Sequence, residues 1–122
     1  MKEKAIYYYR NGYNCSACIL KAAEEVYNIP ITKQSLEMCS GISNGFGTGG
    51  MCSVLVAGIM VLGLIFDEAA VRRMRLEFLT GFSEKYGSIN CSKLKNGQAG
   101  IFCEDLIGDA AKMLGEIIER NR

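Results

Sequence analysis

The chain has 122 residues with six cysteines and no histidine, and its 14 basic and 13 acidic residues leave a net charge of +1. The length suits one domain, and a hydrophobic fraction of 49% with a single proline is typical of a globular chain. The near-neutral charge offers no electrostatic footprint for nucleic acid or for an anionic membrane. The lack of histidine excludes Ser-His-Asp and Cys-His catalysis, histidine-ligated metals and the attachment of c-type haem.

The first half of the chain has helical periodicity that is interrupted by glycine. It predicts helices over 3–11, 15–28 and about 33–42, of which the second and third begin after the capping residues Asn14 and Thr32. Residues 43–50 contain too much glycine to hold a helix. We expect them to form a tight or flexible loop that brings the backbone close to Cys52.

The second half of the chain begins with an apolar segment. No charged residue lies between Glu37 and Asp67, and the apolar run 51–66 is shorter than the roughly 20 residues that span a membrane. We therefore expect a buried central helix at about 51–65, and no membrane partner. After it the pattern predicts a helix from the cap Asp67 to about Tyr86, a short turn over 91–95 after Asn90, and a helix over about 102–120.

These elements together predict an all-α fold. No stretch alternates convincingly as a strand, and no internal repeat is visible. The expected architecture is a single domain over 1–122, a compact bundle of five to six helices around the central helix at about 51–65.

The N-terminus indicates the compartment in which the cysteines work. Residues 1–10, MKEKAIYYYR, have no apolar region and no small-residue cleavage site, so we expect a cytoplasmic protein. Stable disulfides are uncommon there, and six cysteines in 122 residues are many for a reduced compartment, where they are more often metal ligands or redox groups. The alternative is that several of them are small buried apolar residues.

The positions of the cysteines divide them into two groups. Cys15, Cys52, Cys91 and Cys103 lie at predicted helix starts, where free amides and the helix dipole favour a thiolate. Cys18 and Cys39 lie further into their helices on apolar faces, and we expect them to be buried. Cys15 and Cys18 also form a C-x-x-C pair, which is typical of dithiol chemistry, although the βαβ context of thioredoxin is lacking.

The sequence resembles the redox-active family that is named for its C-GCAxxG-C-C cysteine pattern. The resemblance covers about residues 5–117 and rests on the motifs GYNC at 12–15, SGI at 40–42, the glycine run up to Cys52, YGSINCSKL at 86–94, and Cys103. The four cysteines of the pattern match the four at helix starts. The central motif departs from the family, because Met51, Ser53 and Val56 stand where the pattern has Gly, Ala and Gly.

The resemblance implies a cofactor. A related domain occurs in split-Soret cytochromes, which carry an iron–sulfur centre besides haem. No haem-binding segment exists in this chain, so the resemblance implies an iron–sulfur cluster without haem.

Three functions remain open at this point. In the first, Cys15, Cys52, Cys91 and Cys103 hold a [2Fe–2S] cluster, or zinc, in an electron-transfer or metal-binding module. In the second, a metal-free thiol–disulfide oxidoreductase uses the pair Cys15 and Cys18 or the pair Cys52 and Cys91. In the third, a helical binding or assembly domain has cysteines only in its core. We expect a redox partner protein, and hydrophobic helix faces allow a homodimer.

Overall fold

The computed structural model describes residues 1–43, 45–91, 94 and 103–122. In chain order its elements are α1 (Lys2–Arg10), α2 (Cys15–Tyr27), α3 (Lys33–Met38), the 3₁₀ turn η1 (Cys39–Gly41), the turn η2 (Gly45–Gly49), α4 (Ser53–Ile65), α5 (Glu68–Tyr86) and α7 (Cys103–Asn121). Within these ranges an isolated bridge between Met51 and Asn90 is the one extended pairing. The predicted all-α fold is confirmed.

Capping residues place three helix starts where the sequence predicts them. The side chains of Asn14, Thr32 and Asp67 each accept a hydrogen bond from the backbone N–H three residues ahead, at 2.9, 3.1 and 2.9 Å. Gly87 ends α5 in the left-handed conformation, with φ of 79°. The predicted turn over 91–95 lies partly outside the described residues, but the amide of Leu94 donates to the carbonyl of Asn90 at 3.0 Å, as in a helical turn.

The third helix is shorter than predicted. Instead of continuing to residue 42, α3 ends at Met38 and tightens into η1. Serine hydroxyls bind backbone carbonyls on either side of this point: Ser40 donates to Glu37 at 2.9 Å, and Ser43 donates to Cys39 at 3.3 Å. Such bonds compete with the hydrogen bonds of the α-helix, which explains the early end.

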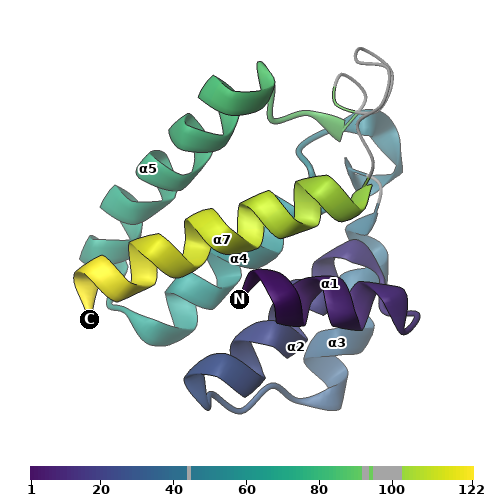
Figure 1. The fold of residues 1–122 in the computed structure, drawn as a ribbon, viewed down its shortest axis with the longest axis horizontal. Coiled ribbons are helices and arrows are strands. Elements are labelled where there is room, and N and C mark those ends of the chain that lie inside the picture. Colours follow the sequence, from purple (N-terminus) through teal and green to yellow (C-terminus); the bar gives the residue numbers. More distant parts are fainter. Residues whose placement is uncertain (44, 92–93, 95–102) are drawn as a thin grey trace.

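Helix α4 lies at the centre of the bundle and contacts α2, α5 and α7, while α1 packs on α2 and α7. Figure 1 shows α7 running in front of α4. Leu55, Val61 and Leu62 are fully buried, but Met60 and Leu64 are 39% and 58% exposed. The expectation of a buried central helix is thus confirmed, and Met60 and Leu64 are the large apolar side chains of α4 that stay exposed. No helix among the described residues is long and apolar enough to cross a membrane.

The glycine-rich segment forms the expected tight turn beside Cys52. A side chain at Gly45 would stand 2.6 Å from the Gly50 carbonyl oxygen and 2.8 Å from the Cβ of Cys91, so only glycine fits there. Beyond the turn, the amide of Cys52 donates to Ile89 at 2.8 Å, and that of Cys91 donates to Gly50 at 2.6 Å. These two bonds hold the segments of Cys52 and Cys91 side by side.

Substitution of two glycines on α4 tests how tightly it is packed. A Cβ at Gly58 would stand 2.6 Å from the buried ring of Phe78, whereas a Cβ at the exposed Gly63 would meet nothing within 4 Å. We expect Gly58→Ala to lower the free energy of unfolding by about 1–2 kcal/mol through overpacking. We expect Gly63→Ala to raise it by about 0.5 kcal/mol through helix propensity. Urea denaturation measures both, and equal effects of the two substitutions would contradict the packing described.

Candidate cysteine site

Four of the six cysteines line one pocket, although they come from four separate segments. Cys15 begins α2, Cys52 precedes α4, Cys91 follows the bridge to Asn90, and Cys103 begins α7. The remaining lining residues are Ser53, Val54, Leu94 and Leu106. The four cysteines that the sequence analysis grouped by their positions at helix starts are therefore neighbours in space.

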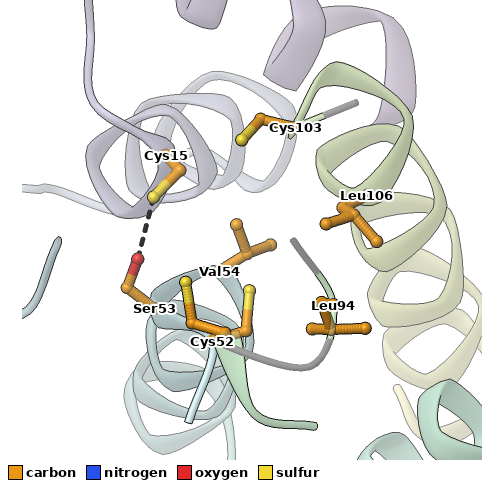
Figure 2. Close-up of a pocket in the computed structure, with 8 residues that line it drawn as sticks. Cys15, Cys52, Ser53, Val54, Leu94, Cys103 and Leu106 are labelled. Atoms are coloured by element: carbon orange, nitrogen blue, oxygen red, sulfur yellow. Dashed lines mark hydrogen bonds between the residues drawn. The ribbon is translucent and has the colours of Figure 1, made fainter. Parts of the chain in front are cut away.

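The pocket is small and mostly apolar. Its free volume is about 20 Å³, which is room for about one water molecule. Figure 2 shows the side chains of Cys15, Cys52 and Cys103 around the same space, with Val54 and Leu106 beside them. The lining of the pocket is mostly apolar, and Cys52 and Cys91 are buried, whereas Cys15 and Cys103 are partly exposed, so solvent screens charge less at the first two sulfurs than at the others.

Cys18 and Cys39 lie outside this pocket in the hydrophobic core. They are 0% and 1% exposed. The Cys18 thiol donates to the Cys15 carbonyl at 3.0 Å, and the Cys39 thiol donates to the Ser35 carbonyl at 3.5 Å. The expectation that both are buried is confirmed.

The environment of Cys52 combines opposing influences on its pKa. Burial is the largest and raises the pKa, while the nearby backbone amides of Val54 and Leu55 lower it. These amides form no cap hydrogen bond with the Cys52 side chain, and the Leu55 amide donates to the Cys52 carbonyl at 3.0 Å. The net effect raises the pKa of Cys52 from 9.0 to about 11. The helix start does favour a thiolate here, as expected, but in a metal-free pocket burial outweighs it, so the expected net stabilisation of a thiolate at Cys52 is wrong.

Two hydroxyl groups lie beside cysteines of the pocket. Ser53, the first residue of α4, places its Oγ 2.8 Å from the Sγ of Cys15 (dashed in Figure 2), and Ser53 is only 2% exposed. On α1, Tyr9 lies near Cys103; burial first, and then the charge of Cys103, raise the pKa of Tyr9. Neither residue is predicted from the sequence to belong to the site. The serine beside Cys52, where the family pattern has alanine, was the available signal.

The chemistry of the site is that of thiols without other donors. All six cysteines are free thiols in the structure. Among the described residues no three Cys, Asp or Glu side chains stand close enough together to hold a metal ion as they are placed. The four pocket cysteines are nevertheless a suitable donor set for zinc or an iron–sulfur cluster, which thiolates bind. Their sulfurs would have to draw toward a common centre.

The burial of Cys18 predicts a loss of stability at alkaline pH. Burial first, and then the charge of Cys15, raise the pKa of Cys18 from 9.0 to about 12. The folded chain therefore keeps a proton that the unfolded chain releases. This contribution is fully present below about pH 9 and is lost as the pH rises toward 12, by at most about 1.4 kcal/mol per pH unit.

Cys18→Ala should remove that part of the pH dependence. Urea denaturation of the reduced, chelator-treated chain at several pH values from 8 to 11 measures it. The cavity left by the substitution costs the same at each pH, so only the slopes are compared. Parallel slopes for the parent and the variant would contradict the prediction.

The comparison with known proteins agrees with the cysteine pattern. The model of the family described as "Putative redox-active protein (C_GCAxxG_C_C)" matches residues 13–117, a range that contains all six cysteines and therefore the whole pocket set. No curated protein and no solved structure matches the chain significantly. Because the matched range covers nearly the whole chain, the protein belongs to the C_GCAxxG_C_C family of redox-active proteins.

Proposed function

We propose that the chain is a redox module in which Cys15, Cys52, Cys91 and Cys103 bind a thiophilic metal centre. A [2Fe–2S] cluster is the first candidate, and zinc is the alternative. The observation that carries the proposal is the gathering of these four cysteines at one apolar pocket, while the other two lie in the core. The membership of the chain in a redox-active family also supports a redox function.

The residues around the pocket suit an anionic metal centre. With no histidine in the chain, thiolates are the ligands that the pocket supplies, and four thiolates are the usual ligand set of a [2Fe–2S] cluster. When bound, such a cluster supplies a one-electron carrier. The backbone amides at the start of α4, those of Val54 and Leu55, lower the pKa of Cys52 and so favour negative charge there, and the mostly apolar lining limits access of water.

Binding of a metal would also change the protonation of the pocket. Cys52 holds its proton at neutral pH, because burial raises its pKa to about 11. A metal ion must displace that proton, so its affinity should increase with pH. The metal would thereby replace the neutral Cys52 thiol by a thiolate at the start of α4, where the helix dipole favours negative charge.

Reconstitution tests the proposal directly. The reduced chain is incubated anaerobically with ferrous iron and sulfide, and a second sample with zinc alone. We expect visible absorbance together with iron and acid-labile sulfide in equal amounts, about two of each per chain for a [2Fe–2S] cluster. Single substitutions Cys15→Ala, Cys52→Ala, Cys91→Ala and Cys103→Ala should abolish loading or reduce it strongly.

Cys18→Ala and Cys39→Ala are the matched controls, since they remove equally small thiols from outside the pocket. Both variants should load as the parent does. A chain that binds neither iron nor zinc would exclude the metal proposal, and equal losses in all six variants would show that the pocket has no special part in it.

A second candidate function is supported by the bridge between Met51 and Asn90. Its hydrogen bonds hold Cys52 and Cys91 beside each other at the pocket. With a pKa of about 11, Cys52 is a poor attacking thiol at neutral pH, so Cys91 would attack a substrate disulfide and release one substrate thiol. Cys52 would then displace the second substrate thiol. The substrate gains two electrons and two protons, and a Cys52–Cys91 disulfide forms.

Oxidation of the metal-free chain tests this candidate. Diamide or glutathione disulfide should produce a Cys52–Cys91 disulfide, identified by mass spectrometry of peptides, and Cys91→Ala should prevent it. Cys18 has its thiol directed at the Cys15 carbonyl and a pKa of about 12, so it should stay reduced. A Cys15–Cys18 disulfide as the main product would instead favour the C-x-x-C pair.

A further inference from the structure

Ser53 places a buried hydroxyl group against one sulfur of the pocket. Its Oγ lies 2.8 Å from the Sγ of Cys15, and the residue is 2% exposed. Within the described chain, Ser16 and Ser53 are the two polar residues that are buried. A buried hydroxyl group without a hydrogen-bond partner costs free energy, so the hydroxyl of Ser53 needs the Cys15 thiol as its partner. The same contact restricts the position of the Cys15 side chain.

We infer that Ser53 is a positioning residue that holds the sulfur of Cys15 at the pocket and donates a hydrogen bond to it when Cys15 serves as a metal ligand. This inference rests on the proposed metal site for its consequence, but the positioning is a property of the metal-free chain. The thiol and the hydroxyl can each be the donor in a neutral pair. A ligating sulfur has lost its proton, and Ser53 is then the donor.

The start of α4 is involved with two sulfurs of the pocket, those of Cys52 and Cys15. Cys52 precedes the helix and contributes its own thiol, while the next residue, Ser53, contacts the thiol of Cys15 at the start of α2. The two helices are packed against each other, which fixes the distance between these starts. The first turn of α4 thus supplies one ligand and orients another.

The family pattern makes this contact a feature of the present chain. The pattern GCAxxG has alanine after its central cysteine, and an alanine side chain cannot form a hydrogen bond. Hydrogen bonds to the sulfurs of a cluster shift its reduction potential, because they stabilise the more negative reduced state. Ser53 should therefore raise the potential of a centre bound through Cys15 above that of the same site with alanine.

The positioning is tested first without metal. In the reduced chain, Hα–Hβ couplings measured by NMR give the χ1 rotamer populations of Cys15. We expect one dominant rotamer in the parent, and a ratio of that rotamer to the others that falls about fivefold in Ser53→Ala, the factor for about 1 kcal/mol of hydrogen bond. Ser53→Thr keeps the hydroxyl and should retain the dominant rotamer, which keeps the inference falsifiable should Ser53→Ala not fold.

Ser16→Ala is the matched control. It removes a hydroxyl that is just as buried and adjacent to Cys15 in sequence, but that bonds to Asn14 and to the Cys39 carbonyl. The Cys15 rotamer should be unchanged in this variant. Unchanged populations in Ser53→Ala, or an equal loss in Ser16→Ala, would overturn the inference.

The second measurement uses the reconstituted protein. The midpoint potential of the loaded centre should be lower in Ser53→Ala than in the parent, and close to that of the parent in Ser53→Thr. An equal potential in parent and Ser53→Ala would overturn the tuning role. If no iron binds to the parent, the proposed metal function fails, while the rotamer measurement still decides whether Ser53 positions Cys15.

Discussion

The packing of α4 against α2 and α7 is the constraint on which the cysteine site depends. Since α4 carries no charge, its most favourable position is between other helices, and it contacts three of them. That position brings its first turn next to the starts of α2 and α7, where Cys15 and Cys103 lie. The glycine turn and the bridge to Asn90 then bring Cys91 alongside Cys52. The site is thus a consequence of where the hydrophobic helix is buried.

This arrangement places two physical effects in opposition. Helix starts favour negative sulfur, because their free amides face it, and an apolar pocket favours the neutral thiol. At Cys52 the second effect prevails in the metal-free chain, and the pKa rises to about 11. Metal ions bound there would reverse the balance, since their positive charge offsets that of the thiolates that hold them. At Cys52 the pocket therefore favours the protonated thiol without metal, and a bound metal would favour the thiolate.

Local features of the fold could be predicted from the sequence, because they depend on neighbouring residues. Asn14, Thr32 and Asp67 cap the helices expected of them. The end of α3 at Met38 is not predicted, since it depends on serine hydroxyls that compete for backbone carbonyls. The exposed side of α4, with Met60 and Leu64, could not be inferred either, because an apolar helix looks buried on every side until its neighbours are placed.

The sequence identifies the residues of the candidate site, but it does not predict that they meet at one point in the fold. Helix-start positions separated the four pocket cysteines from Cys18 and Cys39, and the structure gathers those four at one pocket. No pattern in the sequence says that four segments converge, because their meeting depends on tertiary packing. For the same reason the sequence does not predict the contact of Ser53 with Cys15.

Three residues of the central motif differ from the family pattern, and the four cysteines still line one pocket. Met51 replaces a glycine, but it takes part in the bridge to Asn90, which is formed by backbone groups around it and needs no particular side chain. Val56 replaces the second glycine on a partly exposed position of α4, where a side chain has room. Ser53 replaces alanine inside the pocket, and it is the one change that contacts a cysteine sulfur. The first two changes leave the gathering of the four cysteines intact, and the third alters the chemistry at one of them.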